Sequence, residues 1–199
     1  MNEWVYEVDL PMGALVKRHL QLTTSWVTFN GKSMAVADIW SISIQVTRHF
    51  TNGIPTQTTY QVKLGDANGR DFKLNWSFAS LQKKATKELC EQAYRTLIDM
   101  LADQAGPRII GWLVNQPMPF KLGPLEFSAD GIDVSGLLSA KRAPWPSITR
   151  VAMEQGNYNV FYVNENGKEA RLATMSLMLP NAVFLPEVVS GVRARVLAQ

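Results

Sequence analysis

The sequence is poor in the residues that most often carry chemistry. Its 199 residues include one cysteine, Cys90, and two histidines, His19 and His49. A single cysteine cannot form an intrachain disulfide or a thiolate metal site, and neither histidine has a Cys, Asp or Glu neighbour at metal-ligand spacing. Cys90 lies beside an apolar helical stripe with no histidine near it in sequence, which favours a buried cysteine over a nucleophile. We therefore expect no metal site and no catalytic residue.

Long hydrophobic runs and glycine-rich phosphate motifs are also missing. The longest strongly apolar run, residues 109–114, is much shorter than the roughly 20 residues that cross a bilayer. The first residues show no basic region followed by an apolar stretch, so we expect no secretory signal. Neither Gly-x-Gly-x-x-Gly nor a P-loop occurs. These absences predict a cytoplasmic protein without a transmembrane span, an enzymatic activity or a cofactor.

Charge of one sign is not in large excess. Twenty basic and seventeen acidic residues give a net charge of +3, so the surplus is small and does not suggest nucleic acid as a partner. Hydrophobic residues make up 46% of the chain and charged residues 19%, which is typical of globular proteins. The length allows one large domain or two domains of about 100 residues.

An internal repeat favours two domains. Residues 68–74 and 166–172 match in residue class at six of seven positions, and each segment carries Asn-Gly after alternating apolar residues, as in a β-hairpin with a tight type I′ turn. Upstream, residues 37–42 resemble residues 146–151. Asp38 and Asn68 are 30 positions apart but Ser147 and Asn166 only 19, so the first copy holds 11 more residues. We expect a longer central hairpin at residues 47–58.

Each copy then changes to a helical pattern. Apolar residues recur at every fourth position between residues 81 and 103, and Gly106-Pro107 is expected to stop this helix. A second helix is expected to begin near Pro186. The sequence thus predicts a mainly β protein with α elements, in which a β-barrel or sandwich capped by a C-terminal helix occurs twice. The two domains would be residues 1–105 and 119–199, with a connector at residues 106–118.

This order of strands and one helix, repeated, resembles a tandem of pleckstrin-homology-like (PH-like) domains. Residues 116–125, 130–132, 144–151 and 179–185 are similar to uncharacterised bacterial proteins with such domains, and the first copy matches through residues 38–40 and 58–74. Neither helix contains the tryptophan that plugs the barrel in typical members. The resemblance implies a binding or scaffolding role, with no enzymatic activity and no cofactor.

Two basic clusters are candidate ligand-binding sites. Lys83, Lys84 and Lys87 fall at the start of the first helix, where lysines and free N–H groups could bind a phosphate or an acidic partner. Glu88 and Glu91 lie four residues further on, so a solvated face with ion pairs is favoured over a site. Lys141 and Arg142 are expected in a loop that could touch anionic lipid.

The leading hypothesis is a non-enzymatic protein-interaction or scaffolding protein, whose protein partner binds an exposed strand edge or the groove between the two copies. The alternative is a peripheral membrane protein that binds an anionic lipid or phosphate through the two basic clusters. A homo-oligomer is compatible with both hypotheses. The tryptophans are expected in the core rather than on a base-stacking platform; they are Trp4, Trp26, Trp40, Trp76, Trp112 and Trp145.

Overall fold

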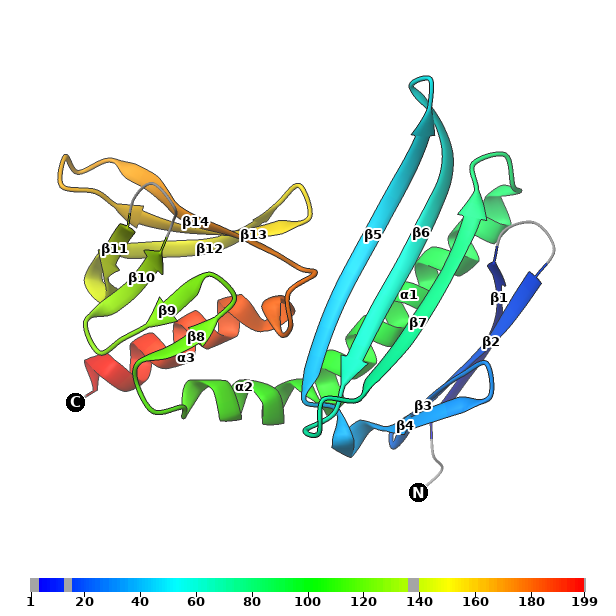
Figure 1. Cartoon of the computed structure of the whole chain (residues 1–199), viewed down its shortest axis with the longest axis horizontal. Coiled ribbons are helices and arrows are strands. Elements are labelled where there is room, and N and C mark those ends of the chain that lie inside the picture. The colour runs from blue at the N-terminus through cyan, green and yellow to red at the C-terminus, as the bar shows by residue number, and fades with distance from the viewer. Residues whose placement is uncertain (1–3, 13–15, 136–139, 199) are drawn as a thin grey trace. The chain divides into compact units, whose positions relative to one another are not determined.

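The computed structural model describes residues 4–12, 16–135 and 140–198. The chain divides into two compact units, unit 1 with residues 1–107 and unit 2 with residues 108–199. Within the described residues, no helix is both long and apolar enough to cross a membrane. In each unit four strands, a 3-10 helix and three further strands precede a C-terminal α-helix (Figure 1).

Unit 1 is built on one sheet of two antiparallel meanders. The first meander contains β1 (Val5–Met12), β2 (Val16–Thr23), β3 (Trp26–Phe29) and β4 (Lys32–Ala35). The second contains β5 (Ser41–Thr51), β6 (Ile54–Gly65) and β7 (Asp71–Ala79). A parallel contact between β1 and β7 joins them in the order β4-β3-β2-β1-β7-β6-β5 (Figure 1). The 3-10 helix η1 (Val36–Asp38) connects β4 to β5.

Helix α1 (Lys84–Gln104) contacts β1 and β7 of this sheet. Its buried side chains recur with helical spacing, as the apolar pattern at residues 81–103 predicts, and they are Cys90, Ala93, Leu97, Met100 and Leu101. Trp76 on β7 is fully buried, and its indole Nε1 donates a hydrogen bond to the backbone oxygen of Cys90 at 3.3 Å. A tryptophan from the sheet, not one from the helix, therefore fixes the helix on unit 1.

Unit 2 repeats the order of elements in two separate sheets. The four-stranded sheet has the order β11-β10-β9-β8 and contains β8 (Phe120–Leu122), β9 (Leu125–Phe127), β10 (Gly131–Ser135) and β11 (Ala140–Pro144). The three-stranded sheet has the order β12-β13-β14 and contains β12 (Ile148–Glu154), β13 (Asn157–Val163) and β14 (Glu169–Ser176). The remaining elements are η2 (Trp145–Ser147), η3 (Ala182–Phe184) and α3 (Leu185–Leu197).

Most of the expected connector at residues 106–118 is helix α2 (Gly106–Val114). Pro107 does not prevent this helix, because the N–H that proline lacks would have no helical partner in the first turn. The end of α2 packs closely on α3, since a Cβ added at Gly191 would lie 2.7 Å from Val114 Cγ2. Arg195 Nη1 also donates to the backbone oxygen of Gln116 at 3.1 Å.

The predicted fold class is confirmed in its coarser part. The chain is mainly β, and each unit ends with an α-helix. The described strands do not form a closed barrel, because β4 and β5 remain the two edges of the sheet in unit 1 and the two sheets of unit 2 stay separate. The prediction of core tryptophans holds for Trp76 and Trp145 but is wrong for three others that are about half exposed, namely Trp4, Trp26 and Trp112.

The two Asn-Gly segments form five-residue loops, so the predicted type I′ turns are wrong. In the loop between β6 and β7, Gly69 has a φ of +77°, but Asn68 is not left-handed. Asp66 Oδ1 accepts hydrogen bonds from the backbone N–H groups of Asn68 at 2.9 Å and Arg70 at 2.8 Å. The Asp66 carboxylate is thereby the hydrogen-bond acceptor for two backbone N–H groups that a tight turn would leave inside the hairpin.

The loop between β13 and β14 has the same construction. Asn164 Oδ1 accepts from the backbone N–H groups of Asn166 at 3.0 Å and Lys168 at 3.1 Å, and Gly167 has a φ of +72°. The central hairpin differs in length between the units: β5 and β6 have 11 and 12 residues, whereas β12 and β13 have 7 each. Nine of the 11 additional residues noted in the sequence thus lengthen the two strands, and the other two lie between η1 and β5.

Candidate functional site

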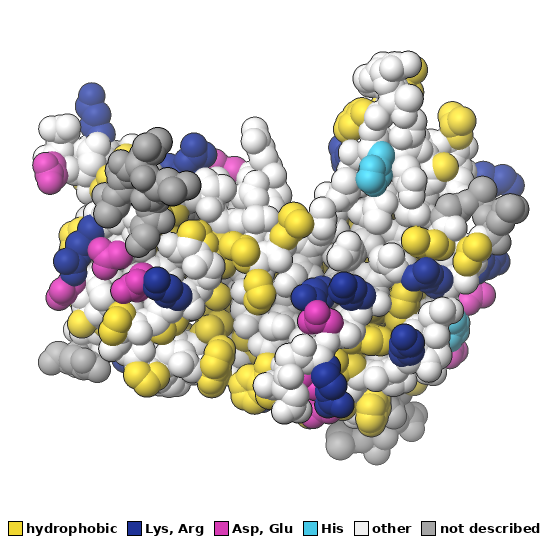
Figure 2. All heavy atoms as spheres, in the orientation of Figure 1, with side chains coloured by type: hydrophobic (Ala, Val, Ile, Leu, Met, Phe, Trp, Pro, Cys, Tyr) yellow, Lys and Arg dark blue, Asp and Glu magenta, His cyan; other side chains and the backbone are white. Residues whose placement is uncertain are grey.

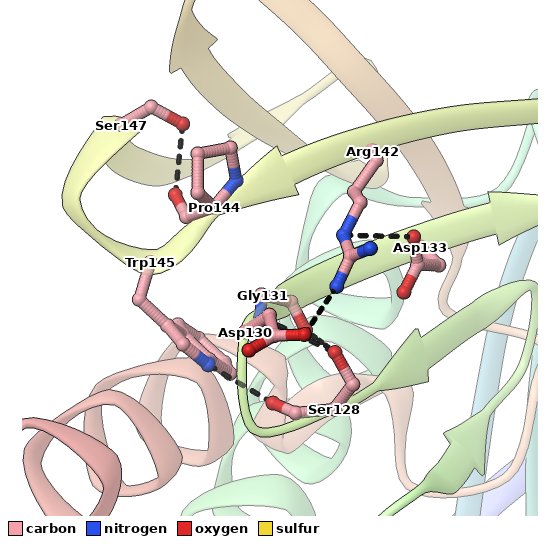
Figure 3. A network of polar contacts seen from close by, with 8 residues as sticks. All are labelled: Ser128, Asp130, Gly131, Asp133, Arg142, Pro144, Trp145 and Ser147. Atoms are coloured by element: carbon pink, nitrogen blue, oxygen red, sulfur yellow. Dashed lines mark hydrogen bonds and ion pairs between the residues drawn. The ribbon is translucent and has the colours of Figure 1, made fainter.

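A corner of unit 2 holds a network of polar contacts (Figure 3). Arg142 on β11 forms an ion pair with Asp130 at 2.8 Å and a longer one with Asp133 on β10 at 3.6 Å. The buried Trp145 donates from Nε1 to the backbone oxygen of Ser128 at 3.0 Å. Ser147 Oγ donates to the backbone oxygen of Pro144 at 2.8 Å. Contacts within the unit therefore hold these side chains in place.

Three residues of this network, Arg142, Pro144 and Ser147, line a cleft of about 500 Å³. The cleft lies between β11, η2 and the β13–β14 loop, and its lining includes Arg142, Ser147, Tyr162 and Glu165. Unit 1 has a cleft of about 370 Å³ at the equivalent corner, between the β3–β4 hairpin, η1 and the β6–β7 loop. The same elements therefore enclose a cleft in both units.

Equivalent hydrogen bonds build the two corners. The first residue of the 3-10 helix donates its N–H to the residue that precedes the third strand, from Val36 to Ser25 at 2.8 Å in unit 1 and from Trp145 to Asp130 at 3.2 Å in unit 2. A hydroxyl oxygen accepts from the N–H three residues later, at 2.9 Å for Thr23 and Trp26 and at 3.2 Å for Ser128 and Gly131. The backbone frame of the corner is thus the same twice.

The two clefts differ in chemistry. A half-exposed indole, Trp26, lines the cleft of unit 1 at the position where unit 2 has Gly131. Asp66 lies in the unit 1 cleft with its ion partner Arg70 at 2.6 Å. Hydrogen bonds from the backbone N–H groups of Arg70 and Asn68 and from the Arg70 side chain lower the Asp66 pKa. Asp66 is therefore charged at neutral pH and stabilises the loop rather than acting as a proton donor.

The structure does not bring the two predicted basic clusters together in one site. Lys83 is the N-cap residue of α1, Lys84 is its first residue, and both are exposed, whereas Lys87 is partly exposed. Lys84 pairs with Glu88 at 3.6 Å, which fits the predicted solvated face. No side chain caps this helix start, and its first turn has no acidic residue.

Lys141 and Arg142 lie on strand β11, so their predicted placement in a loop is wrong. Lys141 is exposed, and Arg142 is engaged by two carboxylates of its own unit. The strand forms because residues 140–144 pair antiparallel with residues 131–135 of β10. The local composition did not indicate this pairing with the preceding strand.

The sequence did not indicate the polar surroundings of His19. Its ring lies between two carboxylates of the neighbouring strand β1, with Asp9 at 3.0 Å from Nδ1 and Glu7 at 3.3 Å from Nε2. The spacing of ten and twelve residues hides this pair, which the β1–β2 register creates. Within the described part of the chain, no group of three His, Cys, Asp or Glu residues could hold a metal ion.

His19 is expected to titrate above its ordinary pKa of 6.5, because the hydrogen bond to Asp9, followed by that to Glu7, favours the protonated ring. The contribution to stability is then complete below pH 6.5 and is lost as the pH rises through the folded-state pKa. NMR titration of the ring protons measures the shift, and Asp9→Asn should lower the pKa. A His19 pKa that Asp9→Asn leaves unchanged would contradict this origin; His49→Gln is the control that should not alter it.

Cys90 is buried on α1, as the sequence suggests. Burial, with a smaller contribution from Glu91, raises the pKa of its thiol to about 12. A thiol with this pKa is protonated at neutral pH, and the thiolate is the reactive form. Its environment is therefore that of a packing residue.

Strand β5 is a long edge strand of the sheet in unit 1, and its first residues lack the features that usually prevent an edge from pairing with another strand. It pairs with β6 along one side, and within the described residues no strand pairs with its other side. Residues 41–47 contain no charge and no proline, and the one irregularity in its pairing lies further on, between His49 and Phe50. Edge strands are usually protected by charge, short length or bulges. Residues 43–47 of β5 therefore offer an open strand edge to an added strand.

Other edges show that protection. At the opposite edge of the same sheet, β4 has four residues and begins with Lys32. In unit 2, the edge strand β12 has an irregular register between Ile148 and Arg150, and Arg150 pairs with Glu169 at 3.0 Å. The contrast singles out β5 as a candidate binding edge.

Comparisons with known proteins do not assign the chain to a family. No model of a protein family matches the chain, and no curated protein is found as a relative.

Proposed function

We propose that the chain is a non-enzymatic protein-interaction or scaffolding protein built from two PH-like modules, and that β5 binds a protein partner as an added strand. The observation that carries the proposal is the open side of the edge strand β5 at residues 43–47. An extended segment of the partner would continue the sheet through backbone hydrogen bonds, while its side chains provide specificity.

The order of elements supports the assignment to PH-like modules. In each unit a four-stranded meander, a 3-10 helix and a three-stranded meander precede the C-terminal helix. The repeated loop of Asp66 and Asn164 and the repeated corner contacts support the descent of the two modules from one ancestor. The resemblance to PH-like domains implies that such modules bind partners and perform no catalysis.

The side chains of β5 indicate the kind of segment that would bind. Ile42 and Ile44 are buried on one face, while the alternate side chains at residues 41–47 on the other face are polar and partly exposed. Gln45 and Thr47 on that second face hydrogen-bond to each other at 3.0 Å. Because neighbouring strands match residue types on each face, we expect a partner segment that alternates apolar residues with Ser, Thr or Gln.

A proline substitution on β5 tests this proposal. Adjacent amides of a strand point to opposite sides, so either Gln45→Pro or Val46→Pro removes an outward N–H and leaves the bonds to β6 intact. Peptides of the alternating type, selected from a random library for binding to the full chain, should bind that variant at least about tenfold more weakly. Isothermal titration calorimetry measures the affinity, and circular dichroism identifies the variant that keeps its fold.

Alanine at the same positions is the matched control, because Gln45→Ala and Val46→Ala keep the amide and should bind like the wild type. Equal binding by the folded proline variant would overturn the edge as the binding site. Selected sequences that resemble β5 itself would show that the edge binds a second copy of this chain. This result would also overturn the proposal that the partner is a different protein.

A further inference from the structure

The hairpin of β5 and β6 extends beyond the rest of unit 1. Strand β7 pairs with β6 up to Gln57 and Ala79, and the hairpin continues past this point to a turn at Asn52 and Gly53 (Figure 1). The turn after β7 lies next to this extension, because the N–H of Ser80 donates to the backbone oxygen of Thr56 at 2.9 Å. Two chain turns therefore share one end of the unit.

Large apolar side chains are exposed at this end. Phe50 is 60% exposed, Ile54 is 67% exposed, and Leu81 in the turn after β7 is completely exposed. Phe50 pairs with Pro55 and Ile54 pairs with Thr51, so Phe50 and Ile54 lie on opposite faces of the hairpin. We call Phe50, Ile54 and Leu81 the apolar tip. Figure 2 shows hydrophobic side chains at this projecting end.

Basic residues lie close in sequence to Phe50 and Leu81 of the apolar tip. Arg48 lies on β5 just before Phe50, and Lys83 and Lys84 follow Leu81 at the start of α1, with Lys87 one turn further. Residues 39–65 and 72–87 contain no Asp or Glu. The carboxylate that follows, Glu88, is exposed and pairs with Lys84 at 3.6 Å. This end therefore combines exposed apolar side chains with positive charge.

We infer that the apolar tip and its basic residues dock unit 1 on an anionic lipid bilayer, with Phe50, Ile54 and Leu81 inserted between the headgroups. Exposed apolar side chains next to Lys and Arg match the boundary between acyl chains and anionic headgroups. A protein surface would cover one face of the hairpin, whereas a bilayer surrounds both faces and so accommodates Phe50 and Ile54 together. The docking residues are distinct from residues 43–47, at which the partner strand is proposed to bind.

The equivalent hairpin of unit 2 is shorter and has a carboxylate next to its turn. It turns at Gln155 and Gly156 after strands of 7 residues, and Glu154 precedes the turn. Met153 is 55% exposed there, but the nearby carboxylate would oppose an anionic surface. This hairpin supplies a matched control for both length and charge.

Vesicle co-sedimentation of the full chain tests the inference. The wild type should bind vesicles of phosphatidylcholine mixed with phosphatidylserine at low salt, bind less at high salt, and not bind pure phosphatidylcholine. Phe50→Ser combined with Ile54→Ser, and separately Lys83→Glu combined with Lys84→Glu, should each weaken binding at least about tenfold. Met153→Ser should bind like the wild type.

A fluorescent probe distinguishes insertion from surface adsorption. Ile54→Cys can be labelled selectively with an environment-sensitive dye, because Cys90 is buried. The emission should shift to the blue when anionic vesicles are added, and the same dye at Met153→Cys should not shift. Binding without a blue shift at residue 54 would show electrostatic adsorption alone and would overturn insertion.

Two further results would overturn the docking of the tip. One is no binding to anionic vesicles at low salt by the folded wild type. The other is loss of a protein partner, with no effect on vesicles, when Phe50 and Ile54 are replaced, which would assign the tip to a protein. The proline variants of β5 keep the apolar tip and should still bind vesicles, so the edge-strand proposal and this inference can fail independently.

Discussion

Trp76→Ala is expected to lower the free energy of unfolding of unit 1 by about 3–5 kcal/mol, the usual range for a large aromatic side chain removed from a core. Trp76 is fully buried, and its ring centroid lies 5.8 Å from that of Tyr60 and 6.4 Å from that of Phe29. The substitution also leaves the backbone oxygen of Cys90 without the indole donor at 3.3 Å. The sheet and helix α1 therefore both lose the contacts that Trp76 makes between them.

Hydrogen exchange measured by mass spectrometry on the full chain would locate this effect. Peptides from β6, β7 and α1 should lose protection in Trp76→Ala, and Trp76→Phe should lose much less because it keeps most of the ring volume. The matched control is Trp26→Ala, since Trp26 is half exposed and its removal should cost under about 1 kcal/mol. Similar losses for Trp26→Ala and Trp76→Ala would show that burial does not explain the role of Trp76.

Periodicity predicted those helices whose apolar residues face a single partner. The stripe of Ala93, Leu97 and Leu101 is buried on α1 as expected, because one face of that helix covers the sheet. Helix α2 was missed because Gly106-Pro107 was interpreted only as a stop. Ile109 and Leu113, four residues apart and both buried, were the signal that could have identified it.

The candidate sites depend on contacts that sequence spacing does not encode. The lysines of α1 could be placed from the sequence, since their position follows from a local helix start. The position of these lysines relative to Phe50 and Ile54 could not be predicted from the sequence. It depends on the hydrogen bond between Ser80 and Thr56, and Thr56 lies on the part of β6 that extends beyond Gln57. An exposed strand edge was a general expectation, but its identity as β5 follows from the complete strand order.

The repeat was visible in the Asn-Gly loops and in residues 37–42 and 146–151, but not in the residues that lead into the third strand of each unit. Asn-Gly recurs because both loops need a left-handed residue at Gly69 and Gly167. The corner contacts run through backbone groups and interchangeable hydroxyls, so Trp26 in one unit and Gly131 in the other occupy the same hydrogen-bonded position. Such backbone geometry persists while side chains change, which is why residues 23–26 and 128–131 show little similarity.

Gly131 is the position at which this corner leaves no room for a side chain. A Cβ there would lie 2.1 Å from the backbone oxygen of Ala143 and 2.8 Å from Pro144 Cα. Both are backbone atoms of the strand paired with β10, so they cannot move aside as a flexible side chain would. Gly131→Ala is therefore expected to lower the free energy of unfolding of unit 2 by at least about 2–3 kcal/mol.

The displacement of β10 from β11 should also disturb the neighbouring polar network. Arg142 and Asp133 face each other across these two strands, so their ion pair at 3.6 Å depends on the same register. Hydrogen exchange on peptides of β10 and β11, together with urea unfolding, would measure the loss. Gly111→Ala in helix α2 is the control, because a Cβ there meets no atom within 4 Å and alanine should stabilise the helix by about 0.5–1 kcal/mol. If Gly131→Ala were as stable as Gly111→Ala, the close approach of β10 and β11 could not be what requires glycine at this corner.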